Sequence, residues 1–250
     1  MISHMRKIVI VNHKVVVGKT TSAINISAGL ARKGNNVIII DADPQANLTE
    51  SFGIFDPPKD LYLSFSKGEP LPIIKVKTNL SLVPNSLNFS GIELEIAGRM
   101  PREIILKELM AGLEKTYDYS IIDCPPSLGL ITLNALVAAD EVYIPMEAEF
   151  LAYRGIDSII GIINLVKKHF NPGLMIKGVF FTKYNEQRVL TKEIKNQIKG
   201  YFGDNLMKTN IRVNVALAEA QSSGKDVFEY DPESNGAKDY MSLVNEIIKK

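Results

Sequence analysis

The sequence predicts an α/β fold in which a mostly parallel, twisted sheet is flanked by helices. Short apolar runs typical of buried strands alternate with longer stretches of helical periodicity along most of the 250 residues. The first apolar run ends near the turn Gly18-Lys19-Thr20 and is followed by an apolar helix, which is the pattern of a P-loop. The length and an apolar content of 46% are sufficient for one large core, so we expect a single domain over residues 1–250.

Each element of this fold is predicted from apolar periodicity and turn residues. The expected strands span residues 7–12, 36–41, 80–84, 119–123, 141–145 and 176–182. The expected helices span residues 19–33, 91–97, 102–115, 128–137, 153–169, 190–200 and 236–249. Residues 55–79 contain four prolines and are expected to form an irregular surface excursion. Residues 1–5 are interpreted as a cloning scar or a disordered start, because a second methionine precedes the first strand.

Composition and charge restrict the expected environment and partners. Cys124 is the single cysteine, so no internal disulfide is expected, and a reducing cytoplasm is the natural location. No apolar run reaches the length of a membrane span, and the first residues lack the apolar core of a signal peptide. The net charge of +1 provides no general attraction to nucleic acid, so any DNA binding must come from a local basic patch.

The segment from Lys14 to Thr21 predicts a site for phosphate groups. A buried strand, a tight turn and a helix that starts there direct backbone N–H groups and the positive end of the helix dipole at one point. In this arrangement Lys19 would reach the outer phosphates, and the Thr20 hydroxyl would ligate Mg²⁺. The strict pattern has glycine six residues before Lys19, where this chain has His13. A second lysine, Lys14, stands five residues before Lys19 instead.

Carboxylates end two of the other expected strands. Asp123 closes an apolar strand, where it would hold Mg²⁺ through a water near Thr20; taken alone, it would be interpreted as an ordinary aspartate that caps a turn. Asp41 and Asp43 are two residues apart at the end of another strand, so the strand period puts both carboxylates on the same side. Pro44 then ends the strand pairing. Together with the Gly-Lys-Thr turn, these acids favour a metal-assisted phosphate site.

Four ordered segments of the chain resemble the ParA/Soj-like partition ATPases, which belong to the deviant Walker A group of P-loop NTPases together with MinD. The segments are the loop 14–21, the strand and switch 37–47 with its sequence Asp41-Ala42-Asp43-Pro44-Gln45, the Walker B strand and turn 120–129, and the C-terminal stretches 214–220, 224–225 and 230–232. Four motifs in order over nearly the whole chain are far more specific than a lone Gly-Lys-Thr.

This resemblance implies an ATPase whose cofactors are ATP and Mg²⁺. It assigns Asp43 to positioning the attacking water and Asp41 to the neighbourhood of Mg²⁺, beside Thr20 and Asp123. The lysine equivalent to Lys14 crosses, in the family, to the nucleotide of a facing subunit and neutralises charge that develops in phosphoryl transfer. The nucleotide contacts that the resemblance implies are Lys14, Val17, Gly18, Lys19, Thr20, Thr21 and Asn214.

The same resemblance implies how such an ATPase works with its partners. ATP drives two copies into a homodimer, and the dimer binds DNA without regard to sequence. A ParB-type centromere-binding protein stimulates the slow hydrolysis. The implied role is the segregation of plasmid or chromosome DNA, and the implied location is cytoplasmic and nucleoid-associated, with no membrane contact.

Val15 and Val16 depart from the family pattern, which has glycine at both positions. Glycine accepts positive φ and allows another backbone or a phosphate to come close, whereas a β-branched residue does neither comfortably. One interpretation is that the valines strain or reshape the loop and impair dimerisation and hydrolysis. The other is that the local φ is negative and the side chains point into a gap, which would leave nucleotide binding intact.

The DNA-binding residues are predicted from the few basic residues left in the C-terminal segments. Soj-type proteins carry arginines there, and most of them are absent from this chain. The expected DNA contacts are Arg212, Lys225 and Lys238. With the terminal Lys249 and Lys250 they would form a patch together with the lysines at 192, 195 and 199, because phosphate contacts need charge and no fixed position. The alternative interpretation of each residue is a solvated side chain on a helix face.

Three other functions are compared with partition. A MinD-like membrane-associated regulator would need a basic amphipathic C-terminal helix, whereas residues 240–250 resemble a docked core helix. A metabolic relative would need cluster cysteines or an extra substrate domain. A nucleotide-binding module that does not hydrolyse ATP is the alternative that the two valines favour.

Overall fold

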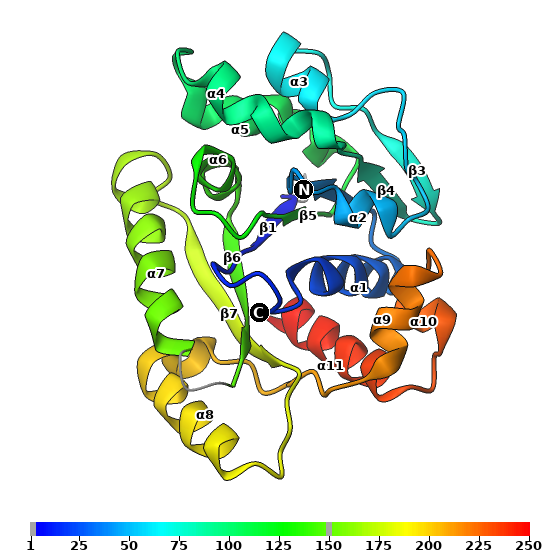
Figure 1. The fold of residues 1–250 in the computed structure, drawn as a ribbon, viewed down its shortest axis with the longest axis vertical. Helices are drawn as coiled ribbons and strands as arrows, with labels where there is room; N and C mark the ends of the chain where they lie inside the picture. The colour runs from blue at the N-terminus through cyan, green and yellow to red at the C-terminus, as the bar shows by residue number, and fades with distance from the viewer. Residues whose placement is uncertain (1–3, 149–151) are drawn as a thin grey trace.

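The computed structural model describes residues 4–148 and 152–250. Within these ranges, one seven-stranded sheet runs in the order β3-β4-β2-β5-β1-β6-β7 (Figure 1). The strands are β1 (Arg6–Ile10), β2 (Val37–Asp41), β3 (Ile74–Lys77), β4 (Leu80–Val83), β5 (Tyr119–Asp123), β6 (Glu141–Glu147) and β7 (Met175–Thr182). All neighbouring strands are parallel except β3, which is antiparallel to β4. The predicted fold class is therefore confirmed.

Helices cover both faces of this sheet. They are α1 (Lys19–Arg32), α2 (Asn47–Glu50), α3 (Leu61–Lys67), α4 (Ile92–Ile96), α5 (Ile105–Leu109), α6 (Leu130–Ala138), α7 (Ala152–His169), α8 (Val189–Phe202), α9 (Val215–Ser222), α10 (Val227–Tyr230) and α11 (Asn235–Lys249). Short 3₁₀ turns lie at Leu87–Gly91, Arg102–Ile104, Leu113–Lys115 and Gly203–Asn205.

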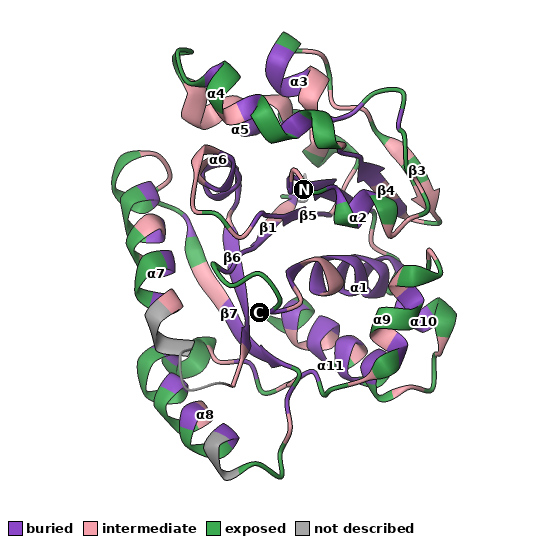
Figure 2. Cartoon of the chain, viewed as in Figure 1, coloured by how far each residue is buried: buried purple, intermediate pink, exposed green. Residues whose placement is uncertain are grey.

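The core has two parts, one on each face of the sheet, because alternate residues of a strand point to opposite faces. Val9 packs with residues of α6 and α7 on one face, and Ile8 packs with residues of α1 and α11 on the other. Figure 2 shows the central strands buried between these layers. α1 and α11 lie very close together, since a Cβ built on Gly29 would stand 2.7 Å from Cγ2 of Val244.

The parallel register brings the carboxyl ends of three central strands to one level. Asp123 at the end of β5 is paired in register with Ile10 of β1 and with Asp41 of β2. Loops that leave these ends therefore meet at one edge of the sheet. This edge is where an open parallel sheet usually binds its ligand.

The prediction was wrong in the region of residues 55–79. Instead of an irregular surface excursion, this region contains α3 and β3, and Leu61 and Phe65 are fully buried. The prolines flank these elements and do not interrupt them. The prediction also missed the short helices α2, α9 and α10. The helix expected over 102–115 is broken, because Gly112 adopts a left-handed φ of 91°.

Candidate functional site

The loop between β1 and α1 forms the centre of the candidate site. Gly18 adopts a φ of 76° and precedes Lys19, the first residue of α1, and no side chain in the described part of the chain caps this helix. The first turn of α1 contains no acidic residue. The unpaired N–H groups at this end and the positive end of the helix dipole are therefore directed into the loop, which is the arrangement that binds phosphate. Figure 2 shows this loop as an exposed segment beside buried strands.

Hydrogen bonds that join this loop to distant strands fix its shape. Asn12 donates from Nδ2 to the carbonyl of Pro145 at 2.6 Å, and its Oδ1 accepts from the backbone N–H of Lys14 at 2.9 Å. Thr182 at the end of β7 donates from Oγ1 to the carbonyl of Val17 at 2.9 Å. Lys183 donates from Nζ to the carbonyl of Val16 at 2.8 Å. The loop is thereby attached to both β6 and β7.

Thr20 and Asp123 form the contact at the metal end of the site. The Thr20 hydroxyl donates to Oδ2 of Asp123 at 2.7 Å. The Asp123 side chain is fully buried, and within residues 4–148 and 152–250 its Oδ1 atom has no hydrogen-bond partner. Burial and the neighbouring Asp41 raise the pKa of Asp123 well above its usual value. A buried carboxylate with a free oxygen beside a hydroxyl provides the hard oxygen ligands that Mg²⁺ prefers.

Asp41 and Asp43 both lie beside this contact, but they make different interactions. Asp41 is fully buried, and its Oδ2 accepts from the backbone N–H of Thr49 at 2.9 Å and from the Thr49 hydroxyl at 2.6 Å. Burial raises the pKa of Asp41 to about 7, although the bonds from Thr49 oppose the shift. Asp43 accepts from the backbone N–H of Gln45 at 2.9 Å and lines the open pocket. Asp41 therefore anchors the loop before α2, and Asp43 presents its carboxylate at the pocket.

The pocket in front of the loop has a volume of about 630 Å³. Its wall includes Lys19, Thr20, Asp43, Pro126 and Gln221. In this structure Lys19 bends back over the loop and donates from Nζ to the carbonyl of Lys14 at 2.9 Å. Burial lowers the pKa of Lys19, while Asp123 and Asp43 oppose that shift.

Thr21, another predicted nucleotide contact, also lines this pocket. Its hydroxyl donates to Oε1 of Gln221 at 2.8 Å, which ties the first turn of α1 to α9. The pocket therefore brings together residues of the P-loop, of the switch after β2 and of α9.

Lys14 and Lys183 both pair with one carboxylate at the end of β6. Nζ of Lys14 lies 2.9 Å from Oε2 of Glu147, and Nζ of Lys183 lies 2.6 Å from Oε1. Burial raises the pKa of Glu147, but the two lysines outweigh burial, so this pKa lies below its usual value. Lys14 is consequently held against Glu147 of its own subunit.

Val15 and Val16 are accommodated without a left-handed backbone. Among the described residues, positive φ at a residue other than glycine occurs at Ala46, Asn79 and Lys183. The two valine side chains are 70% and 63% exposed and line the mouth of the pocket. The expectation of a strained loop is therefore not met, and the structure has the alternative geometry in which the valines point outward.

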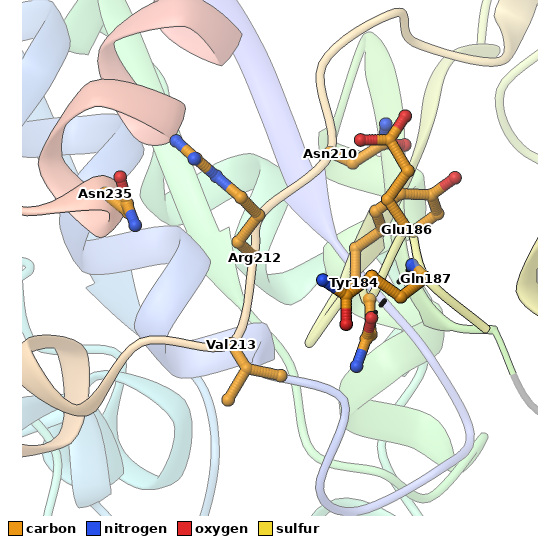
Figure 3. A pocket seen from close by; sticks show the side chains of 8 residues that line it. Tyr184, Glu186, Gln187, Asn210, Arg212, Val213 and Asn235 are labelled. Carbon is orange, nitrogen blue, oxygen red and sulfur yellow. Dashed lines mark hydrogen bonds between the residues drawn. The ribbon is translucent and has the colours of Figure 1, made fainter.

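A second hollow of about 610 Å³ is lined by Tyr184, which directly follows Lys183 of the first pocket in the sequence. Figure 3 shows Tyr184, Glu186 and Gln187 on one side of it, with Asn210 and Val213 on the chain segment before α9. Side-chain amides and an aromatic ring give this hollow both hydrogen-bonding groups and an apolar surface.

Asn214, a predicted nucleotide contact, caps α9 instead of lining either hollow. Its Oδ1 accepts from the backbone N–H of Ala216 at 2.9 Å. The capping hydrogen bond is the role that asparagine commonly has before the first turn of a helix. The neighbouring Val213 lines the second hollow.

Two of the three predicted DNA contacts have acidic partners. The Arg212 guanidinium is paired with Asp239 at 2.7 Å, and Lys238 lies 3.3 Å from Glu233. Lys225 is exposed. On α8, the residues Lys192 and Lys199 are exposed, and the Lys195 ammonium lies over the ring of Tyr184.

Sequence reasoning missed the residues that hold the loop in place. They are Asn12, Glu147, Thr182 and Lys183, and each lies at or just beyond the carboxyl end of a strand. Their position at strand ends was the available signal, because parallel strands bring these ends to one edge of the sheet.

The chain is similar to known proteins over nearly its whole length. Residues 5–176 match the family model described as AAA domain. The chain is 41% identical over 245 residues to the sporulation initiation inhibitor protein Soj of Bacillus subtilis, covering 96% of this chain and 97% of that protein. It is 38% identical to the chromosome-partitioning ATPase Soj of Treponema pallidum, with 98% of each chain covered.

A solved structure with the same fold is cobyrinic acid a,c-diamide synthase from Mycobacterium smegmatis with bound ATP analogue and magnesium. It superposes with a TM-score of 0.85 at 29% identity and covers 98% of this chain and 95% of that chain. That synthase chain has little beyond the shared fold. The expectation that a metabolic relative must carry an extra substrate domain is therefore wrong.

Proposed function

Because the chain belongs to the Soj/ParA family of chromosome-partitioning ATPases, we propose that it binds Mg²⁺-ATP and uses slow hydrolysis to segregate DNA. The observation that carries the proposal is the 2.7 Å contact between Thr20 and Asp123, at the floor of a pocket that Lys19 and Asp43 also line. A hydroxyl, a buried carboxylate, a lysine and a second carboxylate at one pocket are the groups that phosphoryl transfer needs.

Thr20 and Asp123 are the residues that would hold Mg²⁺. The Asp123 oxygen that has no partner within the described part of the chain supports this assignment. When bound, Mg²⁺ supplies charge neutralisation for the phosphates. Asp41 is already engaged by Thr49, so its carboxylate would act by fixing the switch loop.

Lys19 and the first turn of α1 would hold the phosphates. The Lys19 ammonium now donates to a loop carbonyl and would turn toward the phosphate oxygens, which are stronger acceptors. Gly18 leaves the backbone N–H groups accessible at the same point. The adenosine half of the nucleotide would occupy the second hollow, where the side-chain amides of Gln187 and Asn210 offer hydrogen-bonding groups to a base.

Asp43 would orient the attacking water, because its carboxylate faces the pocket while its backbone is fixed. The Asn85 amide donates to the Asp43 carbonyl at 3.1 Å, and Asp43 itself accepts from Gln45. A carboxylate held in this way can accept a proton from water at a defined place. Hydrolysis is expected to be slow until the site is completed from outside the subunit.

Lys14 would complete the site of a facing subunit in an ATP-dependent homodimer. The Lys14 side chain is half-exposed in its present ion pair with Glu147, so a change of partner could carry the ammonium outward. Val15 and Val16 stand exposed beside it and would meet their copies across such an interface. We therefore expect the valines to weaken dimerisation more than nucleotide binding, and to reduce hydrolysis with it.

Non-specific DNA and a ParB-type protein are the proposed partners of this dimer. Dimerisation would place two copies of each basic surface on one body, which raises avidity for a polyanion. Because Arg212 and Lys238 have acidic partners, the exposed Lys192 and Lys199 on α8 are better supported as phosphate contacts. Nucleoid association would follow from this binding.

A membrane-associated function is less well supported. No helix in residues 4–148 or 152–250 has the length and apolarity to cross a bilayer. The apolar face of α11, with Leu243, Val244 and Ile247, is buried in the core, so this helix has no free apolar face for a membrane surface.

The test is light scattering after size exclusion at increasing ATP, with Mg²⁺ present, and with ADP as the control nucleotide. We expect a concentration-dependent shift from monomer to dimer with ATP and none with ADP. Tight nucleotide binding with neither dimer nor turnover would support the non-hydrolysing module instead. ATP-dependent sedimentation with anionic vesicles, in place of DNA, would support the MinD-like function.

A further inference from the structure

The helix α6 begins directly after the loop that follows Asp123, and it lacks a capping side chain of its own. Gly129 occupies the cap position, and no side chain of the loop accepts from the first turn. Glu93 of α4 supplies the missing acceptor, since its Oε1 accepts from the backbone N–H of Ile131 at 2.9 Å. A negative charge at the amino end of a helix also interacts favourably with the helix dipole.

The absence of a side chain at position 129 makes room for this carboxylate. A Cβ built on Gly129 would lie 2.6 Å from Oε1 of Glu93 and 2.9 Å from Oε2. Even a methyl group at this position would displace the carboxylate. The backbone φ of Gly129 is −83°, so an alanine would add the methyl group without backbone strain.

The capped helix end is linked to the pocket through the intervening loop. Thr132 in the first turn of α6 donates from Oγ1 to the carbonyl of Ser127 at 2.6 Å. The ring Nδ1 of His13, in the β1–α1 loop, lies 3.2 Å from the carbonyl of Pro126. Pro126 itself lines the pocket beside Lys19 and Asp43.

We propose that Glu93 is a positioning residue of the phosphate pocket. It caps α6 from outside the helix and thereby holds the loop 124–129 against the pocket. The inference rests on the proposed function, because it takes the pocket to be the nucleotide site. Glu93 itself is not among the described residues that line the pocket. Glu93 links α4 to the loop 124–129, so that a movement of α4 would be transmitted to the phosphate pocket.

Four single variants and one double variant test this link. Glu93→Ala removes the cap, and Glu93→Gln keeps a neutral acceptor of the same shape. Gly129→Ala displaces the carboxylate while Glu93 is still present. Glu95→Ala is the matched control, because Glu95 lies on the same helix and pairs with Arg99 instead of α6.

The measurements are the Kd of the folded protein for Mg²⁺-ATP and amide hydrogen exchange of residues 124–132. We expect Glu93→Ala and Gly129→Ala to raise the Kd by about 3- to 10-fold, the range given by loss of a charged helix cap, and to speed exchange in this segment. Glu93→Gln should recover part of both effects, and Glu95→Ala should change neither. The double variant Glu93→Ala/Gly129→Ala should match Glu93→Ala alone, because the methyl group then has no carboxylate to displace.

Equal Kd values for the parent, Glu93→Ala and Glu95→Ala would overturn the inference and leave the proposed function intact. A lower melting temperature with an unchanged Kd would also overturn it, since that result indicates a purely structural cap. If the parent itself bound no Mg²⁺-ATP, the proposed function and this inference would both fail. The exchange data would still show whether Glu93 holds the loop.

Discussion

Replacing Val15 and Val16 by glycine is expected to lower the stability of the monomer and to strengthen its ATP-driven dimer. The side chains are 70% and 63% exposed, so roughly a third of each is removed from water. Complete burial of a valine contributes about 1.5–3 kcal/mol, so the loss of this third costs about 0.5–1 kcal/mol per residue. Two added glycines cost a further 0.4–1 kcal/mol each, roughly, through the freedom of the unfolded chain. The free energy of unfolding should therefore fall by about 2–4 kcal/mol.

The effect on the dimer has the opposite sign. Bulk at a close contact costs about 1–3 kcal/mol per site, so removing it should lower the dimer Kd at least about tenfold in the presence of Mg²⁺-ATP. Denaturant unfolding and light scattering measure the two effects separately. Phe55→Ala is the matched control, because Phe55 is another exposed apolar residue at the same pocket. Its substitution leaves the backbone of the loop 14–21 unchanged. A stable ATP-bound dimer of the parent, unchanged by the glycines, would refute the steric argument.

Two further predictions concern carboxylates of the site. Asp43→Ala should reduce ATP turnover at least about 100-fold while the Kd for Mg²⁺-ATP changes less than about threefold, because the side chain would orient water and not phosphate. Gln45→Ala is the control. Equal turnover of the two variants would show that the water-positioning role is wrong. Glu147→Gln should lower the free energy of unfolding by about 1–2 kcal/mol at pH 7, because the ion pairs with Lys14 and Lys183 are lost. The loss is small because both lysines are half-exposed. The pKa of Glu147 is depressed in the folded state, so the parent's advantage should be complete above about pH 4.3 and disappear as the pH falls through the lower folded-state pKa. A difference in stability that is constant from pH 7 to pH 3 would contradict the ion-pair explanation.

The sequence was sufficient to predict the parts of the site that come from local motifs. The strand, turn and helix around Lys19, the carboxylate after β5 and the switch after β2 are each contained in about ten consecutive residues. The resemblance to ParA/Soj-like ATPases rested on these motifs and is confirmed by the relatives. The ligand roles of individual residues, including Thr21 and Asn214, remain predictions.

The contacts that hold the motifs in place depend on the tertiary fold. Asn12 reaches Pro145, and Thr182 reaches Val17, across more than 130 residues of sequence. Local periodicity contains no information on such pairs. The ion pair of Arg212 with Asp239 is of the same kind, because it joins a loop to a helix that the pattern treats as separate elements. DNA binding by Arg212, Lys225 and Lys238 stays a prediction.

The prediction of the fold was wrong in a segment where turn residues are more frequent than apolar residues. Four prolines between residues 55 and 79 predicted a surface excursion, yet Leu61 and Phe65 complete the core from a helix of seven residues. So short a helix depends on tertiary packing for its stability, and its own sequence gives little sign of it.

Isothermal titration of Mg²⁺-ATP into the parent and into Lys19→Ala tests the central claim, that the loop 14–21 binds the phosphates. Lys33→Ala is the control, because Lys33 lies at the opposite end of the same helix and is exposed. The account predicts one site per chain in the parent and in Lys33→Ala. It predicts a Kd at least about 100-fold higher for Lys19→Ala, since a charge-assisted contact to phosphate is lost. Equal affinity of the parent and Lys19→Ala would contradict it.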